Sequence, residues 1–271
     1  MGTNDAQTWS ETWRGRRGKV RPRWGFIFRR IARHVALEDK EVLELGAGEG
    51  SLSYYALQAG ARQATLVDFS DEAFRLARQL LAGWPADKVA YVKASLLDVE
   101  LGRQFDLVWS SGVVEHFAGN DLARCIERHT AHSRRYVAIC IPSDTPFNRR
   151  RARDPHTHAL FGFWQTIPDE TLAGLIREQG FEIRVCERFR RSYGVPLLQL
   201  KGTRRVQAWL HRLIFDFLLA PVLPRRLGGL LLVVGERRAG SEQQAGDSSS
   251  TSRRNGDCSS ARRREWCNRG F

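Results

Sequence analysis

Long apolar runs and paired cysteines are both scarce in this chain of 271 residues. No uncharged stretch approaches the roughly 20 residues that a transmembrane helix needs. The first 24 residues lack the apolar core of a secretory signal. The five cysteines form no C-x-x-C pair, and an odd number argues against a complete disulfide framework. These absences predict a cytoplasmic protein with reduced thiols.

The excess of positive charge lies mainly at the two ends of the chain. The formal net charge is +13, from 43 Lys and Arg against 30 Asp and Glu. Residues 1–35 contain nine basic and two acidic residues, and residues 237–271 contain eight and four. The middle is therefore close to neutral, which predicts no specific nucleic-acid partner for it. A hydrophobic content of 42% is enough to fill the core of a globular domain.

Changes in apolar patterning divide the chain into three parts. Residues 1–35 are predicted to form a basic N-terminal cap, with an amphipathic helix at 24–35. Residues 36–238 are predicted to form the main domain, which includes a helical insertion at about 195–227. Residues 239–271 lack the apolar periodicity that would offset the entropy of ordering, so they are predicted to be a disordered basic tail.

Short apolar runs alternate with helix-like segments through the main domain. The runs lie at residues 41–45, 64–69, 89–94, 105–111, 135–142, 181–189 and 228–238. Strands that alternate with helices of this length pair in parallel through right-handed crossovers. The pattern predicts an α/β fold with a doubly wound, mostly parallel, seven-stranded sheet, an N-terminal helical cap, and a helical insertion before the last strand.

Three glycines, Gly46, Gly48 and Gly50, directly follow the first predicted strand. They form a tight turn at the carboxyl end of that strand, where open α/β sheets bind ligands. A dinucleotide fingerprint would need a further glycine at position 51, which is Ser51. Glu44 stands two residues before the first glycine, where its carboxylate would repel a pyrophosphate. Such a group suits a ligand that carries an ammonium and a sulfonium.

The segments "LELGAGEG", "LVDFS" and "FDLVWSSGVVEHF", in this order, resemble the class I S-adenosylmethionine-dependent methyltransferases. The similarity is greatest to the small-molecule branch that includes ubiquinone-biosynthesis methyltransferases. It spans residues 40–189, with a final strand at 228–238. The resemblance implies a Rossmann-like methyltransferase fold and S-adenosylmethionine as the cofactor.

By this resemblance, the carboxyl ends of the first four strands would bind the cofactor. Asp68 would accept hydrogen bonds from both ribose hydroxyls, and Phe69 would flank the adenine. The third strand departs from the family pattern, because Ser95 stands where an aspartate usually contacts the adenine amine. Ser95 with the backbone N–H of Leu96 is the preferred substitute, and Asp98 is the alternative. The implied cofactor-binding residues are Glu44, Gly46, Ala47, Gly48, Gly50, Asp68, Phe69, Ser95, Leu96, Ser110 and Gly112.

Histidines are the candidates on the acceptor side. Methyl transfer mainly requires alignment of a nucleophile, but a base helps when the acceptor is a hydroxyl. His116, whose ordinary pKa would be about 6.5, is a candidate base, and a structural histidine is the alternative. His156 and His158 are candidate substrate-binding residues in a loop that otherwise reads as a solvated basic segment. Their H-x-H spacing does not by itself predict a metal site.

The fourth strand excludes several classes of methyltransferase. The segment "SSGV" replaces the N/D-P-P-Y-like turn of nucleic-acid amino methyltransferases, and Glu115 stands alone where protein arginine methyltransferases need paired glutamates. We therefore expect methylation of a small, lipophilic metabolite, on oxygen rather than nitrogen or carbon. An NAD(P)-dependent oxidoreductase and a non-catalytic basic module that binds RNA or membrane are the alternatives.

The insertion contains an apolar helical stripe between residues 204 and 226, with arginines around it. His211, Arg212 and Asp216 interrupt the stripe too often for a transmembrane helix. Three interpretations remain open: a lid over a lipophilic acceptor, an interfacial helix on an anionic membrane, or a helix packed on the sheet or on a second subunit.

Overall fold

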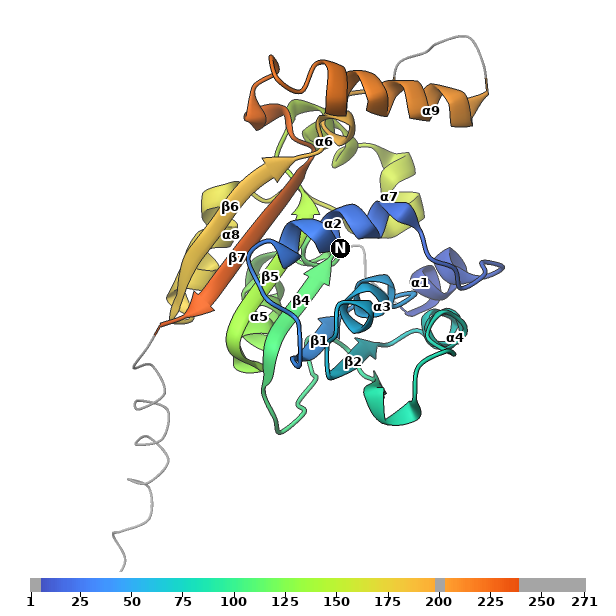
Figure 1. Cartoon of the computed structure of the whole chain (residues 1–271). Coiled ribbons are helices and arrows are strands. Elements are labelled where there is room, and N and C mark those ends of the chain that lie inside the picture. Colours follow the sequence, from blue (N-terminus) through green and yellow to red (C-terminus); the bar gives the residue numbers. More distant parts are fainter. Residues whose placement is uncertain (1–5, 198–202, 239–271) are drawn as a thin grey trace, which may run out of the picture. The chain divides into compact units, whose positions relative to one another are not determined.

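Seven strands form one sheet in the computed structural model, which describes residues 6–197 and 203–238 (Figure 1). The strand order is β3-β2-β1-β4-β5-β7-β6. Strand β7 runs antiparallel to both of its neighbours, whereas the other pairs are parallel. The strands are β1 Glu41–Leu45, β2 Gln63–Asp68, β3 Val89–Lys93, β4 Phe105–Ser111, β5 Ser133–Pro142, β6 Phe181–Phe189 and β7 Leu230–Arg237. The predicted α/β fold with a mostly parallel, seven-stranded sheet is confirmed.

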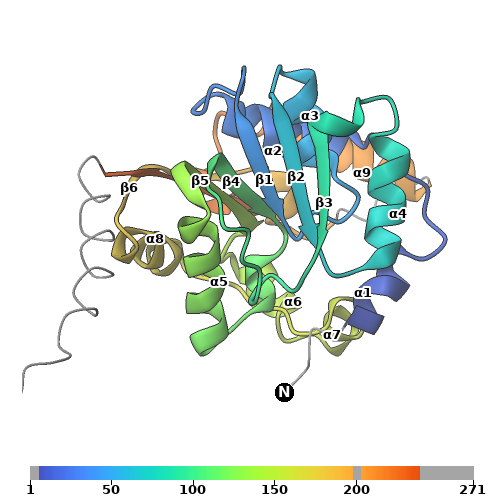
Figure 2. The same ribbon diagram turned by 90° about the horizontal axis from the view of Figure 1, so that it is seen from below.

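Helices cover both faces of this sheet, as Figure 2 shows from below. The helices α2 Pro22–Ala32, α3 Ser51–Gln58 and α4 Asp71–Leu80 contribute to one apolar core. The helices α5 Gly119–Ala131 and α8 Asp169–Glu178 contribute to the other. Side chains alternate between the faces of a strand, so Val42 belongs to the first core and Leu43 to the second.

The order of the strands reverses between β1 and β4. From β1 the chain continues outward to β2 and β3, and from β4 it continues outward to β5 on the other side. The register pairs Leu45 with Val67 and Glu44 with Trp109, so the carboxyl ends of these three strands lie together. Ligands bind at such a reversal in open α/β sheets, because the following loops diverge and leave a crevice.

Short helices surround the carboxyl edge of the sheet. Helix α1 Ala6–Trp13 contacts α4 and also α7 Pro155–Phe161, and α6 Pro146–Arg151 precedes α7. Single turns complete the connections: η1 Ala86–Lys88, η2 Val114–His116, η3 Arg191–Tyr193 and η5 Arg225–Leu227. The segment after β4 therefore forms the turn η2, and α5 begins only at Gly119.

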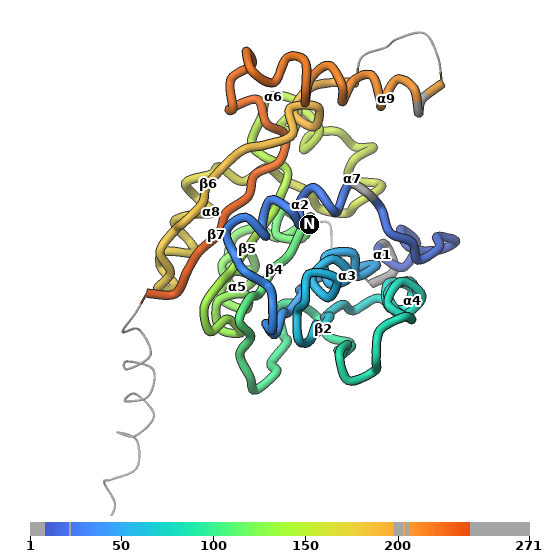
Figure 3. The backbone as a smooth tube through the Cα atoms, in the orientation of Figure 1, coloured from blue at the N-terminus to red at the C-terminus, as the bar shows by residue number. Residues whose placement is uncertain are grey.

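The insertion consists of α9 Arg204–Leu213 and a π-helical turn, η4 Ile214–Leu218, and Figure 3 traces it between β6 and β7. Polar contacts attach it to η3: Asp216 accepts hydrogen bonds from the N–H and the hydroxyl of Ser192 at 3.0 and 2.7 Å, and pairs with Arg190 at 3.1 Å. None of the helices within 6–197 and 203–238 has the length and apolarity of a membrane span. The predicted tail, residues 239–271, lies outside the described residues.

Candidate functional site

The glycine turn connects β1 to α3 in a left-handed backbone conformation. Gly46, Gly48 and Gly50 have φ values of 65°, 54° and 72°, a region that side chains rarely adopt. The N–H of Ala47 donates to the carbonyl of Val67 at 2.9 Å, which joins the turn to the end of β2. The turn therefore presents bare backbone at the reversal point of the sheet, as the sequence predicts.

Glu44 lies behind this turn, with its carboxyl group buried. Its Oε2 accepts hydrogen bonds from the backbone N–H and the hydroxyl of Ser53, at 2.9 and 2.6 Å. Ser53 is in the first turn of α3, so the carboxyl satisfies one of the N–H groups that a helix leaves open at its start. Burial raises the pKa of Glu44 to about 7. Near neutral pH, ionising the Glu44 carboxyl group therefore costs little additional free energy, so it can act as an anion beside the turn.

Asp68 joins the ends of β1 and β2 directly. Its two carboxylate oxygens accept hydrogen bonds from the N–H of Gly48 at 2.8 Å and of Ser70 at 2.9 Å. Burial raises the pKa of this carboxyl group, while the two N–H donors oppose that shift. Ser70, and not Asp68, caps helix α4, because its hydroxyl accepts from the N–H of Ala73 at 3.3 Å. Phe69 is half-buried beside this carboxylate.

The two candidates for the adenine contact, Ser95 and Asp98, follow the end of β3 and have different partners. Ser95 is exposed, and its hydroxyl accepts from the N–H of Leu97 at 3.3 Å, while Leu96 is buried. Asp98 is exposed and pairs with Arg124 of α5 at 3.1 Å. This exposed ion pair directs Asp98 toward α5, and the contact of Ser95 and Leu96 with the adenine stays a prediction.

Adjacent serines at the end of β4 face opposite ways. The Ser110 hydroxyl lies 2.8 Å from Nε2 of His129, whose Nδ1 lies 2.7 Å from the carbonyl oxygen of Cys125. Nδ1 must donate to that carbonyl, so Nε2 is unprotonated and accepts a hydrogen bond from the hydroxyl of Ser110. This pairing directs the Ser110 side chain toward α5, contrary to the expectation that it faces the cofactor. Ser111 and Gly112 instead line a pocket.

His116 is held by its surroundings rather than aimed into the pocket. Its Nδ1 lies 2.7 Å from the carbonyl oxygen of Phe163, and Trp9 of α1 packs edge-on against the ring at 4.9 Å between ring centroids. Burial lowers the pKa of His116 to about 4. An imidazole with this pKa binds a proton only weakly at neutral pH. The side chain of His116 is also not among those that line the pocket. These contacts favour the structural alternative.

The two histidines of α7 also lie away from the pocket. The ring nitrogens of His158 face the carbonyl oxygens of Gly162 and Ala152 at 3.1 and 2.7 Å, so this side chain stabilises its own segment. His156 is exposed. Among the residues that the structure describes, no group of three or more His, Cys, Asp or Glu side chains is arranged to hold a metal ion.

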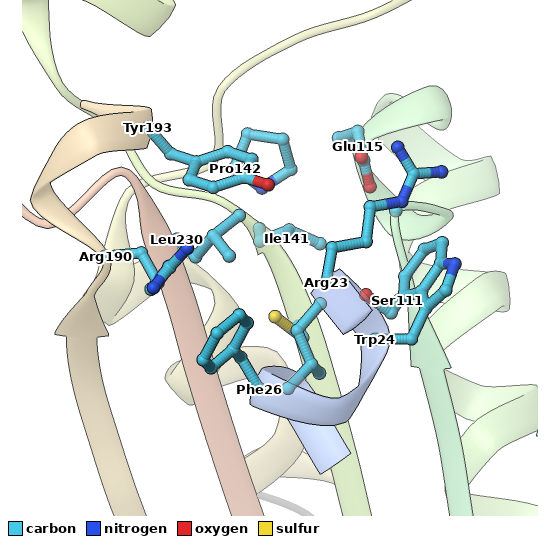
Figure 4. Close-up of a pocket in the computed structure, with 13 residues that line it drawn as sticks. Arg23, Trp24, Phe26, Ser111, Glu115, Ile141, Pro142, Arg190, Tyr193 and Leu230 are labelled. Atoms are coloured by element: carbon cyan, nitrogen blue, oxygen red, sulfur yellow. The ribbon is translucent and has the colours of Figure 1, made fainter. Parts of the chain in front are cut away.

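A pocket of about 190 Å³ lies beside the end of β4 (Figure 4). Apolar side chains from α2, β5 and β7 form most of its wall, and the carboxyl group of Glu115 lies on it. Burial raises the pKa of Glu115 to about 8. Arg190 and Tyr193 reach the pocket from the segment after β6. The apolar lining residues are Trp24, Phe26, Ile27, Ile141, Pro142 and Leu230.

Sequence reasoning missed this pocket because its walls come from segments far apart in the chain. Glu115 was recognisable only as a lone glutamate after the fourth strand. Arg190 lies in an irregular segment without a motif, and Phe26 fits the core-facing stripe of an amphipathic helix equally well. No pattern within one segment could bring these three residues together.

Comparison with known proteins identifies a domain in the first half of the chain. Residues 42–135 match the model of a methyltransferase domain. A probable histone-arginine methyltransferase of Arabidopsis thaliana is 38% identical over 79 residues, covering 28% of this chain and 15% of the relative. A ubiquinone biosynthesis O-methyltransferase of Nitrosospira multiformis is 36% identical over 88 residues, covering 32% of this chain and 36% of the relative. The chain thus matches only about a third or less of the length of these relatives.

Solved structures resemble the chain over a much larger share of its length. An O-methyltransferase family protein from Burkholderia thailandensis has a TM-score of 0.58 at 14% identity, covering 80% of this chain and 57% of the other. An N-methyltransferase from Bradyrhizobium japonicum has a TM-score of 0.57 at 13% identity, covering 88% of this chain and all of the other. Residues 42–135 therefore match a methyltransferase domain, and the fold of the chain is that of methyltransferases of known structure.

Proposed function

We propose that this protein transfers a methyl group from S-adenosylmethionine to an oxygen atom of a small, lipophilic acceptor. The observation that carries the proposal is the joined pair of strand ends, in which Asp68 at the end of β2 is bonded to Gly48 in the glycine turn after β1. This arrangement places a buried carboxylate beside bare backbone, which suits a nucleoside ribose next to an amino-acid moiety. The ubiquinone-type O-methyltransferase relative supports oxygen as the acceptor atom.

The residues of the crevice fit a cationic nucleoside cofactor. The glycine turn brings bare backbone close to the side chains of Val113, Trp13 and Leu66, where a Cβ would clash. Glu44 and Asp68 supply negative charge on two adjacent strands. When bound, S-adenosylmethionine supplies an electrophilic methyl group on a sulfonium. The protein holds the adenine beside Phe69 and Ser95 and the ribose at Asp68. It thereby aligns the donor with the acceptor, and alignment is the main requirement of a displacement reaction.

The similarity to an arginine methyltransferase covers only 28% of this chain and leaves the acceptor open. That match spans 79 residues of this chain. Glu115 is the single acidic residue among the described residues that line the pocket. The pocket wall is otherwise mostly apolar, which favours a lipophilic molecule over a guanidinium. The same wall supports a small-molecule acceptor.

Calorimetric titration with S-adenosylhomocysteine tests the cofactor assignment. Wild-type protein is expected to bind it, and Asp68→Ala to weaken binding by about tenfold or more, because charge-assisted hydrogen bonds to the ribose are lost. Asp71→Ala is the matched control, since Asp71 is an exposed carboxylate three residues away that pairs with Lys93. Thermal denaturation of each variant separates loss of binding from loss of folding.

Two other results would support one of the alternative functions instead. Preferential binding of NAD(P) over S-adenosylhomocysteine would indicate an oxidoreductase. Salt-dependent binding of RNA or lipid without any affinity for S-adenosylhomocysteine would indicate a non-catalytic basic module.

We also infer that the insertion contacts an anionic membrane surface. Part of its apolar stripe faces solvent, because Trp209, Phe217 and Leu218 are 61%, 62% and 66% exposed. The exposed guanidinium groups of Arg212, Arg225 and Arg226 lie on the same segment, and this combination of apolar and cationic groups complements anionic headgroups above acyl chains. The same insertion is bonded to η3, from which Arg190 and Tyr193 reach the pocket. A lipophilic acceptor could therefore enter from the bilayer.

A further inference from the structure

We propose that the pocket beside β4 binds a hydroxylated aromatic acceptor, and that Glu115 accepts the proton of its hydroxyl group. The inference rests on the proposed methyltransferase function and adds to it the acceptor class and the base. It moves both roles away from the histidines that the sequence indicates. The pocket, the buried carboxyl group and the surrounding rings each support a different part of the proposal.

The pocket adjoins the crevice assigned to the cofactor. Gly112, at the end of β4, belongs to both. Trp24 lines the pocket, and its indole N–H donates to Oε1 of Glu49 in the glycine turn at 2.9 Å. One side chain therefore bridges the two sites. An acceptor in this pocket would lie next to the strand end where the reactive part of the cofactor is expected.

Glu115 carries an oxygen without a partner on the pocket wall. The residue is 2% exposed, and its Oε2 has no hydrogen-bond partner among the described residues. Its Oε1 lies 3.6 Å from the position that a Cβ of Gly112 would occupy, so the carboxyl group points along the end of β4. A buried acceptor that stays unpaired is costly, and a hydroxyl donor on a ligand would remove that cost.

Of the described ionisable groups around the pocket, Glu115 is the one that changes its protonation state. Arg151 of α6 is the cation whose charge acts on it, and this charge opposes the increase in pKa that burial causes. Arg23 of α2 lines the same pocket. The charge of Glu115 acts on the nearby thiols of Cys125 and Cys140. Burial raises the pKa of both thiols, so they remain neutral. Glu115 therefore changes between acid and carboxylate within an accessible pH range.

The rest of the wall favours a flat apolar ring. Arg190 lies over the ring of Phe26 at 4.2 Å and pairs with Asp216 at 3.1 Å, so its charge is already balanced inside the protein. Arg23 lies over the ring of Trp24 at 4.9 Å. In Figure 4 Phe26, Pro142, Leu230 and Tyr193 enclose the side opposite Glu115. An aromatic body would contact these side chains while its hydroxyl reaches the carboxyl group.

The step balances without any additional reagent. The acceptor oxygen forms a bond to the methyl carbon, the bond between that carbon and sulfur breaks with its electron pair going to sulfur, and the hydroxyl proton passes to Oε2 of Glu115. The carboxylate has accepted one proton and releases it to solvent after the product leaves. The cationic donor also favours the ionised form of Glu115 before the transfer, because opposite charges stabilise each other at short range.

Calorimetry with matched aromatic probes tests the role of the carboxyl group independently of turnover. With S-adenosylhomocysteine bound, the wild-type protein is expected to prefer 2-naphthol over 2-methoxynaphthalene by about tenfold or more, because only the former donates to Glu115. The preference should grow as the pH rises from 6 to 9, since the carboxylate accepts more strongly than the acid. Glu115→Gln should reduce the preference severalfold and make it independent of pH, and Glu115→Met should abolish it.

Glu127→Gln is the control, because it neutralises an exposed carboxylate of α5 that does not line the pocket. It should leave the preference intact, and the thermal midpoint of every variant reports folding. The proposal is overturned if wild type binds neither probe or both equally, if Glu115→Met keeps the preference, or if Glu127→Gln removes it. Failure of wild type to bind S-adenosylhomocysteine would instead refute the proposed function, so the two failures are distinguishable.

Discussion

Three buried carboxyl groups near one end of the sheet are held in different ways. The oxygen Oε2 of Glu44 accepts hydrogen bonds from the N–H and the hydroxyl of Ser53. Asp68 accepts one N–H from the turn after β1 and one from the turn after β2. Glu115 keeps one oxygen without a donor from the described residues. The first two therefore stabilise the turns of the crevice, in addition to the proposed role of Asp68 at the ribose, whereas the third has one oxygen available to a ligand.

The glycine turn allows a test at a single residue. Gly48 has a φ of 54°, and a Cβ there would lie 2.7 Å from the ring of Trp13. Gly48→Ala should therefore cost more than the roughly 1 kcal/mol expected for a left-handed alanine alone, and it should weaken binding of S-adenosylhomocysteine. Urea denaturation and calorimetry measure the two effects.

Gly102→Ala is the matched control for this substitution. Gly102 has a φ of 62° with no atom within 4 Å of an added Cβ, so it carries the backbone penalty without the clash. Equal losses of stability in the two variants, with equal affinity for S-adenosylhomocysteine, would show that the contact with Trp13 has no role.

At the scale of elements, helix α1 covers the glycine turn. Trp13 packs on Gly48, Trp9 packs on His116, and the hydroxyls of Ser10 and Ser70 lie 3.4 Å apart. The helix contacts α4 on one side and α7 on the other. A ligand that contacts the turn must therefore displace or rearrange this helix as it enters.

Trp13→Ala is expected to raise both the association and the dissociation rate constants of S-adenosylhomocysteine, because the cover over the turn becomes smaller. Stopped-flow fluorescence measures both constants. Trp84→Ala is the control, since Trp84 is half-buried against the core that α2, α3 and α4 share. Unchanged rate constants in Trp13→Ala would mean that α1 does not limit entry.

At the scale of the whole molecule, the insertion exposes apolar side chains in a chain whose ends carry most of its positive charge. Phe217→Ala and Trp209→Ala remove exposed rings and should not disturb the core. Each is expected to weaken binding to phosphatidylserine-containing vesicles, measured by flotation, by about thirtyfold, because burying one such ring in the interface contributes about 2 kcal/mol. High salt should also release the wild-type protein from these vesicles.

The control for membrane binding is Leu160→Ala, which removes an exposed apolar side chain of α7 outside the insertion. Equal binding of wild type and both ring variants, or equal binding to neutral phosphatidylcholine vesicles, would contradict a role for the insertion at an anionic membrane. Concentration-dependent dimerisation that Phe217→Ala abolishes would assign the stripe to a second subunit instead.

The sequence by itself determined the parts of this protein that depend on neighbours in the chain. Alternation of strands and helices specified the sheet, because apolar period and segment length are local properties. The turn at Gly48 and the carboxylate at Asp68 were recognisable because strand ends of a parallel sheet meet at one edge. Their roles in binding a cofactor remain predictions.

Only the tertiary structure decided which side chains face a common space. Ser110 and Ser111 are adjacent, yet strand alternation and a bond to His129 direct one toward α5 and leave the other at the pocket. The pocket gathers Glu115 and Arg190 from segments that share no pattern. Burial and pairing are properties of the packed molecule, because they depend on atoms that the chain brings together only after it has folded.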